Sequence, residues 1–198
     1  MIRSAALDPS TSRDECAFIA IELRGRVWHL AAGKTWQGRT GAPLDIRNKV
    51  APEAARLARN LGCDSWMSDL YMSADVELVS RDFGLSFRRD EAELVESFGH
   101  MRQLARERRV WLRSDNPDLD AVGLQIAGEL RGVTLLRRNG KTQVVLPRSR
   151  GKHGDAARAW IRALWHGRML EDGAAHNYSA GYGLRGGLGT TLCARLVR

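Results

Sequence analysis

Three aspartates stand where short apolar segments begin or end. Asp8 closes the run "SAALD", Asp69 closes "CDSWMSD", and Asp155 opens "DAARAWIRALW". An open α/β sheet places its functional groups at the carboxyl ends of strands, so these carboxylates are candidates to converge. Converging carboxylates repel one another, and a cation relieves that repulsion. The pattern therefore indicates a cation site built from aspartates.

The chemistry of such a site follows from its ligands. Carboxylate oxygens suit Mg²⁺, which keeps several waters when it is bound. Two such ions about 3.5–4 Å apart can activate water and stabilise the leaving oxygen of a phosphodiester. Each aspartate also has an ordinary interpretation: Asp8 before a proline can start a turn, Asp69 can begin a loop, and Asp155 can interact with a helix dipole. Their order and settings together favour the metal site.

A basic segment directly precedes Asp155. The net charge of the chain is +8, and residues 101–198 hold 18 Lys and Arg against 8 Asp and Glu. Residues 131–154 contain no acidic residue and seven basic ones: Arg131, Arg137, Arg138, Lys141, Arg148, Arg150 and Lys152. A solvated basic surface is one interpretation. A track for nucleic-acid phosphates is the other.

Apolar patterning predicts the elements that must position these residues. Strands are expected over 4–9, 16–23, 26–33, 63–69 and 85–89, with a short strand or extended piece over 110–115. Helices are expected over 44–62, 73–84, 90–109, 116–130 and from 155, with N-caps at Ser73 and Asn116 and stops at Gly62 and Gly84. Asn139-Gly140 predicts a type I′ hairpin over 133–147. The order describes one α/β sheet with helices packed on it, followed by a loosely ordered Gly-rich tail from Glu171.

Other classes find no support in the sequence. No run of 18 apolar residues predicts a membrane span, and the first 15 residues contain no signal-peptide core. The three cysteines (Cys16, Cys63 and Cys193) form no C-x-x-C pair, so neither a zinc site nor a disulfide framework is expected. The run "AAGKTW" is not a P-loop, because Trp28 stands where that motif needs its first glycine.

Three longer stretches resemble the nuclease domain of phage terminase large subunits, a family with a ribonuclease H-like fold. "ALDPSTSRDECAFIAI" is similar to its first strand, metal-binding aspartate and second strand. "GKTWQGRTGAPLDIRNKVAPEAARLARNLGCDSWMSD" is similar to its Trp-containing linker, helix and second acid. "GVTLLRRNGKTQVVLPRSRGKHGDAARAWIRAL" is similar to its hairpin, His-x-Asp segment and closing helix. The resemblance covers about residues 3–166.

The resemblance implies an α/β fold: a ribonuclease H-like mixed β-sheet flanked by helices, with an extra β-hairpin near the active site. The nuclease domain would span 1–170 and the Gly-rich tail 171–198. Asp8, Asp69 and Asp155 would be the catalytic metal ligands for two Mg²⁺ or Mn²⁺ ions. The residues expected to bind DNA are Arg137, Arg138, Lys141, Arg148, Arg150, Lys152 and His153, with His153 touching phosphate or orienting its neighbours.

The implied activity is metal-dependent endonucleolytic cleavage of concatemeric viral DNA during genome packaging. The implied partners are double-stranded DNA, a terminase ATPase region, a small terminase subunit and a portal, in the cytoplasm of a bacterial host and without a membrane. Gly154 stands where the family often has a second acid, so a fourth ligand stays open, with Asp14 and Asp64 as weak candidates.

Two other functions remain open from the sequence. A Holliday-junction resolvase of the same fold would have Glu at the second acidic position and paired acids near the end, which Asp69 and His153-Gly154-Asp155 fit poorly. A basic DNA-binding or virion-assembly module would use the same aspartates only structurally. Metal-dependent nicking of DNA separates the enzymes from this module, and a four-way junction substrate separates the two enzymes.

Overall fold

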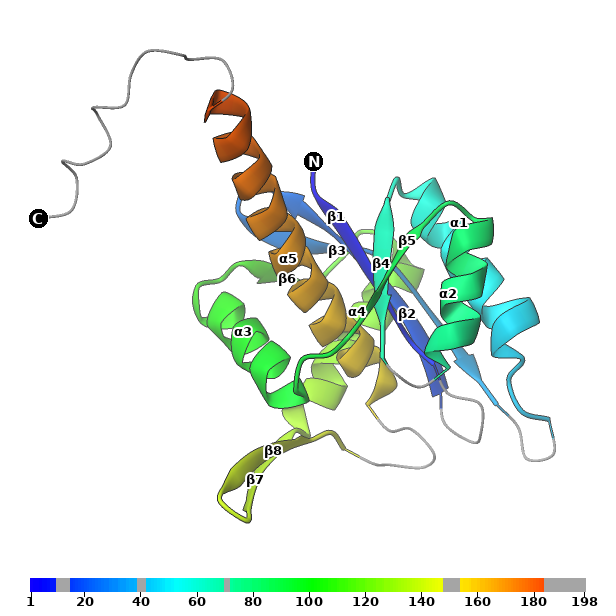
Figure 1. Ribbon diagram of the computed structural model, residues 1–198. Coiled ribbons are helices and arrows are strands. Elements are labelled where there is room, and N and C mark those ends of the chain that lie inside the picture. The colour runs from blue at the N-terminus through cyan, green and yellow to red at the C-terminus, as the bar shows by residue number, and fades with distance from the viewer. Residues whose placement is uncertain (10–14, 39–41, 70–71, 148–153, 184–198) are drawn as a thin grey trace, which may run out of the picture.

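The computed structural model describes residues 1–9, 15–38, 42–69, 72–147 and 154–183, with side chains up to residue 173. Within this part of the chain, six strands form one mixed sheet in the order β5-β4-β1-β2-β3-β6 (Figure 1). Their bounds are β1 Arg3–Asp8, β2 Glu15–Arg24, β3 Val27–Gln37, β4 Ser65–Ser68, β5 Ser86–Arg89 and β6 Val110–Trp111. Strands β1, β2 and β3 are antiparallel neighbours, whereas β4 and β5 run parallel to β1.

Helices cover both faces of the sheet. The π-helix η1 (Ile46–Val50), α1 (Ala51–Asn60) and α2 (Ser73–Asp82) pack on one face. On the other face lie α3 (Leu94–Arg106), α4 (Pro117–Arg131) and the long α5 (Asp155–Gly183), which runs along β1 and β2. The predicted order of elements is confirmed. None of the helices that the structure describes is long and apolar enough to cross a membrane.

The alternation of side chains along β1 decides what faces α5. Ala5 and Leu7 belong to the core beneath α1 and α2, whereas Ala6 belongs to the core beneath α3, α4 and α5. Successive side chains of a strand point to opposite faces, so Ser4 and Asp8 share the α5 face with Ala6. The Ser4 hydroxyl confirms this by donating a hydrogen bond of 2.7 Å to the Ala163 carbonyl. Asp8 is therefore directed toward the last helix.

The predicted helix termini are correct at three of four positions. Asn116 caps α4, because its side-chain oxygen accepts hydrogen bonds from the backbone N–H groups of Asp118 and Leu119. Gly62 and Gly84 follow α1 and α2 with φ of +72° and +65°. The prediction of Ser73 as N-cap is wrong. Met72, with φ of 57°, occupies that position without a side-chain cap, and Ser73 already belongs to the helix.

The hairpin has the predicted turn. Strands β7 (Thr134–Arg138) and β8 (Lys141–Val145) pair antiparallel and are joined by Asn139 and Gly140, whose φ angles of 52° and 75° are those of a type I′ turn. The hairpin lies at the end of the molecule where β1 ends and α5 begins (Figure 1). Leu146, directly after β8, packs against Gly154 beside the first residue of α5. The extra hairpin is therefore anchored next to Asp155.

Two segments extend further than the sequence suggests. The run "AAGKTW" lies within β3, which continues to Gln37, so a strand replaces the loop that a phosphate-binding motif would need. The sequence predicts a Gly-rich tail from Glu171, but α5 continues through that residue to Gly183. Ala174 and Ala175 favour this continuation, since alanine has the highest helix propensity. Residues 184–198 lie outside the described residues.

Two glycines of α5 provide a matched test of how tightly this helix packs. A Cβ atom at Gly167 would lie 2.8 Å from ring carbons of the buried Trp28, whereas a Cβ at Gly173 would meet nothing within 4 Å. We expect Gly167→Ala to lower the free energy of unfolding by about 1–3 kcal/mol through overpacking. Gly173→Ala should raise it by about 0.5–1 kcal/mol through helix propensity. Urea titration measures both, and equal effects would contradict the close packing of α5 on β3.

Candidate active site

Three aspartates lie at the ends of three neighbouring parallel strands. Asp8 is the last residue of β1, Asp69 directly follows β4, and Asp90 directly follows β5. The strands are in register, with Ala6 opposite Met67. The Asp90 N–H extends the pairing by donating a 2.7 Å hydrogen bond to the Ser68 carbonyl. The sheet itself thus places the three carboxylates side by side.

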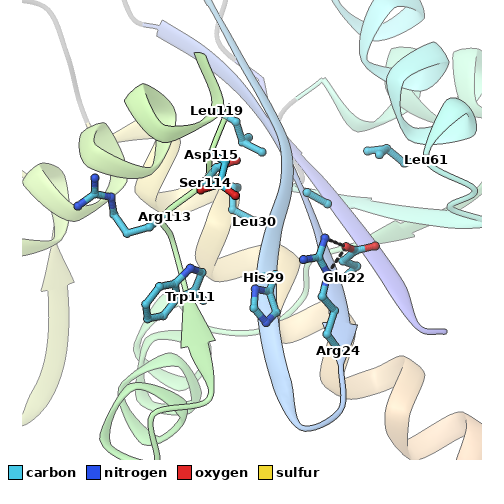
Figure 2. A pocket seen from close by; sticks show the side chains of 11 residues that line it. Glu22, Arg24, His29, Leu30, Leu61, Trp111, Arg113, Ser114, Asp115 and Leu119 are labelled. Atoms are coloured by element: carbon cyan, nitrogen blue, oxygen red, sulfur yellow. Dashed lines mark hydrogen bonds and ion pairs between the residues drawn. The ribbon is translucent and has the colours of Figure 1, made fainter. Parts of the chain in front are cut away.

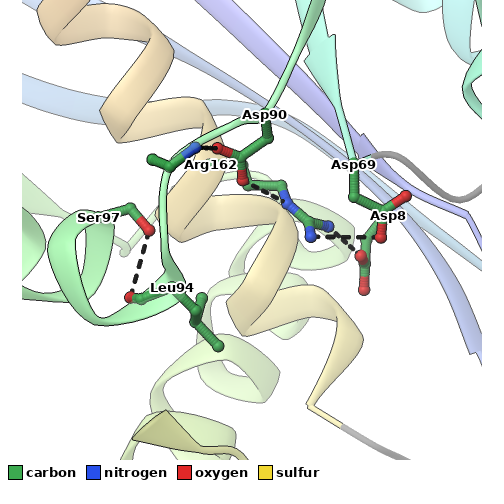
Figure 3. Close-up of polar contacts among 7 residues, drawn as sticks. Asp8, Asp69, Asp90, Leu94, Ser97 and Arg162 are labelled. Carbon is green, nitrogen blue, oxygen red and sulfur yellow. Dashed lines mark hydrogen bonds and ion pairs between the residues drawn. The ribbon is translucent and has the colours of Figure 1, made fainter. Parts of the chain in front are cut away.

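All three carboxylates bind one guanidinium group, that of Arg162 on α5 (Figure 3). The Nε atom donates to Asp90 Oδ2 at 2.9 Å, and Nη2 donates to Asp69 Oδ2 at 3.2 Å. The Nη1 atom donates to Asp8 Oδ1 in a short contact. Each of the three nitrogens of the planar guanidinium therefore serves a different aspartate.

The Arg162 cluster, defined as Arg162 with Asp8, Asp69 and Asp90, is largely withdrawn from water. The side chain of Arg162 is 9% exposed, and those of Asp8 and Asp90 are 4% and 5% exposed. Burial by itself lowers the pKa of Arg162, but the charges of Asp8, Asp69 and Asp90 outweigh burial and raise it above its usual value. Buried charges are tolerated when they are paired and hydrogen-bonded. The end of the sheet is thus shaped for a positive charge.

Asp155 lies on the same helix as Arg162. It is the first residue of α5 and is buried, at 4% exposure. Arg162 follows it by seven positions, about two turns, so both residues share the helix face that lies on the sheet. Side chains of a helix lean toward its N-terminus, so Arg162 extends in the direction of Asp155.

The first turn of α5 is fixed from α4. Glu129 accepts a 2.7 Å hydrogen bond from the backbone N–H of Ala157, one of the donors that a helix N-terminus leaves without a partner inside the helix. Gly154 precedes the helix with φ of +72°, and a Cβ at this position would lie 2.8 Å from the Leu146 Cβ. This backbone explains why glycine, and not a second acid, stands before Asp155.

His166 locks α5 onto the two strands that carry Asp8 and Asp69. Its Nδ1 lies 3.1 Å from the Ser4 hydroxyl on β1, and its Nε2 lies 3.1 Å from the Ser65 hydroxyl on β4. A neutral imidazole offers one donor and one acceptor, which suits two hydroxyl partners. Because Arg162 is one turn earlier on the same face, this lock also holds Arg162 in place.

The other predicted residues divide into three groups. Arg137, Arg138 and Lys141 are exposed at the tip of the hairpin. Asp64 lies before β4, at the opposite end of that strand from Asp69, and its side chain is 98% exposed, so it is no fourth ligand. The remaining predictions lie outside the described residues: Asp14, Arg148, Arg150, Lys152 and His153.

The hairpin packs beside the start of α3. A cleft of about 450 Å³ lies between β8 and the segment that leads into α3, lined by residues 93–95 and 141–145. Its first lining residue, Glu93, follows Asp90 by three positions. The basic hairpin therefore borders the segment that supplies one of the clustered carboxylates.

A second cleft, of about 630 Å³, lies at the other end of the sheet (Figure 2). Glu22 and His29 line it, together with the exposed Trp111. Glu22 pairs with Arg3 at the beginning of β1, whereas Asp8 is at the end of that strand. This cleft is therefore separate from the aspartates.

Sequence reasoning missed Asp90 and Arg162. The sequence places Asp90 in the first turn of a helix over 90–109, but α3 begins only at Leu94. Its position directly after the short run "SFRR" was the available signal, the same one that singled out Asp8 and Asp69. No comparable signal marked Arg162, because an arginine on an Ala-rich helix is ordinarily exposed.

Solved structures of phage large terminases and of their nuclease domains have a similar fold. The large terminase nuclease of thermophilic phage G20c aligns with a TM-score of 0.59 and 16% identity, over 82% of this chain and 80% of that one. The nuclease domain of the large terminase subunit gp2 of virus Sf6, solved with manganese and β-thujaplicinol, aligns with a TM-score of 0.57 and 13% identity, over 83% and 88%. The chain spans 38% of the length of the large terminase of bacteriophage HK97, at a TM-score of 0.60 and 14% identity over 82% of this chain.

RuvC of T. thermophilus, solved in complex with a Holliday junction substrate, also aligns. Its TM-score is 0.50 with 11% identity, over 87% of this chain and 97% of that one. The sequence matches no protein-family model and no curated protein. These structural alignments show that the chain has a ribonuclease H-like fold. Within that fold class it resembles the nuclease domains of phage large terminases, as the sequence predicted.

The buried His166 predicts a pH dependence of stability. Burial lowers the pKa of His166 from 6.5 to about 4, so the unfolded chain binds a proton between these values that the folded chain rejects. Stability must therefore fall as the pH drops through this window, by about 2 kcal/mol between pH 7 and pH 5. Urea unfolding at both pH values should show this loss in the wild type and a smaller one in His166→Gln. The same loss in both proteins would contradict a neutral His166.

Proposed function

We propose that the protein is a metal-dependent endonuclease that cleaves double-stranded DNA by two-metal phosphodiester hydrolysis. The observation that carries the proposal is the convergence of Asp8 and Asp69, from neighbouring parallel strands, on one buried positive charge. Carboxylates that gather around a cation are the ligands that Mg²⁺ and Mn²⁺ require. The substrate proposed is concatemeric viral DNA during packaging, in the cytoplasm of a bacterial host.

The carboxylate oxygens of Asp8 and Asp69 are ligands of the chemical type that the proposed metals bind. Within the described residues, no group of three or more His, Cys, Asp or Glu side chains is arranged to hold a metal ion, and the guanidinium of Arg162 stands among the carboxylates. A site that already accommodates a cation with oxygen ligands suits a hard divalent ion. When bound, two Mg²⁺ or Mn²⁺ ions would supply Lewis acidity and an activated water.

The residues of the proposed site have separate parts in the proposed reaction. Asp8 and Asp69 hold their carboxylates at fixed strand ends, and Asp155 contributes a third from the start of α5. The hairpin residues Arg137, Arg138 and Lys141 bind backbone phosphates beside the site. Arg148, Arg150, Lys152 and His153 extend this phosphate track.

The proposed partners follow the same resemblance. The nuclease domain of residues 1–170 would work beside a terminase ATPase region, a small terminase subunit and a portal. The support is the fold shared with phage large terminases, of which the HK97 protein is much longer than this chain.

A junction resolvase is the second candidate, because the fold of this chain covers 97% of the RuvC chain. A four-way junction and a linear duplex of the same sequence separate the two candidates. A terminase-type nuclease should cut both at similar rates in Mg²⁺ or Mn²⁺. Selective, symmetric cutting of the junction would favour the resolvase.

The aspartates can be tested one at a time. We expect Asp8→Asn, Asp69→Asn and Asp155→Asn each to abolish nicking of supercoiled plasmid in Mg²⁺ or Mn²⁺, because each removes a charged metal ligand. DNA binding, measured by filter retention, should stay nearly intact, and EDTA should stop the wild type. Asp64→Asn is the matched control, since this aspartate is exposed at the far end of β4. Full nicking by any of the three variants would remove that residue from the site.

The basic residues of the hairpin should contribute to the salt dependence of DNA binding. DNA binding should be sequence-tolerant, and replacing Arg137, Arg138 and Lys141 together by Gln should weaken it. The slope of log K against log salt should decrease by about 0.9 for each residue that contacts a phosphate. A charge-matched control replaces Arg56, Arg59 and Arg81, exposed residues of α1 and α2 on the opposite face of the sheet. Equal slopes in the two triple variants would place the DNA elsewhere.

A further inference from the structure

Arg162 is bound unequally by its three aspartates. Asp90 uses both carboxylate oxygens: Oδ1 accepts from the Ala92 N–H at 3.2 Å, and Oδ2 accepts from Arg162 Nε at 2.9 Å (Figure 3). The backbone of Asp90 is itself tied to Ser68. Asp90 is therefore a fixed anchor for the base of the guanidinium.

Asp8 and Asp69 bind the opposite end of the same group. Asp8 accepts from Nη1 and Asp69 from Nη2, the two terminal nitrogens of Arg162. A change in the side-chain torsions of Arg162 would swing the whole planar guanidinium about its hydrogen bond to Asp90, releasing both contacts while that bond stays. The two carboxylates proposed as metal ligands are thus those that Arg162 can release most readily.

We propose that Arg162, anchored on Asp90, competes with the divalent metal for the carboxylates of Asp8 and Asp69 and thereby sets the metal affinity of the site. The inference rests on the proposed function, because it needs these aspartates to be metal ligands. A guanidinium bound to them engages one oxygen of each carboxylate, and its positive charge repels an incoming cation. Arg162 is accordingly a positioning residue that keeps the carboxylates together before metal arrives.

Substitution of Arg162 should raise the metal affinity of the site, whereas loss of a metal ligand should lower it. Lysine keeps the charge but carries a single ammonium group, which lacks the planar fork that reaches three carboxylates at once. Arg162→Lys should therefore free at least one charge-assisted hydrogen bond from Asp8 or Asp69. The metal no longer has to displace that bond, so its affinity should rise about tenfold.

The test measures binding of Mn²⁺ alone, from the electron paramagnetic resonance signal of the free ion, to the full chain without DNA. Wild type, Arg162→Lys, Arg162→Gln and Arg168→Gln are compared. Arg168 lies on the same helix but is exposed over the Trp165 ring and paired with Asp172, so it controls for loss of one charge on α5. Arg162→Lys keeps the net charge and a partner for the buried carboxylates, so it tests the proposal even where Arg162→Gln fails to fold.

We expect tighter Mn²⁺ binding in Arg162→Lys and unchanged binding in Arg168→Gln. Thermal unfolding in EDTA should show Arg162→Lys to be less stable than wild type, and saturating Mn²⁺ should remove most of that difference. Equal or weaker Mn²⁺ binding by Arg162→Lys overturns the inference while the metal-dependent nuclease stands. Absence of Mn²⁺ binding in wild type and in the Arg162 variants, all folded by circular dichroism, overturns both.

Discussion

Electrostatic repulsion among carboxylates at one end of the sheet is the constraint on which the rest of the structure depends. Parallel pairing of β1, β4 and β5 places Asp8, Asp69 and Asp90 together where these strands end. The burial of Asp8 and Asp90 removes the water that would screen their charges. A cation among them relieves this repulsion. Arg162 on α5 supplies this cation. The helix therefore has to pack on the sheet in one fixed position.

The position of α5 on the sheet is set by contacts other than ion pairs. His166 accepts or donates to hydroxyl groups of two strands, while Gly167 lets the helix approach Trp28 closely. At the helix start, Glu129 and Gly154 fix the first turn that carries Asp155. The packing of α5 thus determines the positions of both the buried Arg162 guanidinium and Asp155.

The sequence predicted most elements because their signals are local. The apolar runs of β1 and β2, the Asn116 cap and the Asn139-Gly140 turn act within a few residues, and all have the predicted form. Asp8 and Asp69 were singled out in the same way, since an acid at the end of a strand is a local signal, and the structure brings both to Arg162. Arg162 could not be found in this way, because its role arises from aspartates at sequence separations of 154, 93 and 72 residues. The α5 extension to Gly183 was missed because its glycines suggested a loop.

The same long separations govern when the site can exist during synthesis. Strands β1 and β4 leave the ribosome with their acids long before Arg162 does, since α5 is the last element of the chain that the structure describes. Contacts between distant segments form late in folding because the loop between them must first be closed. A nascent chain that lacks α5 therefore has its aspartates but not the guanidinium that gathers them, and the arrangement is assembled only when translation has passed α5.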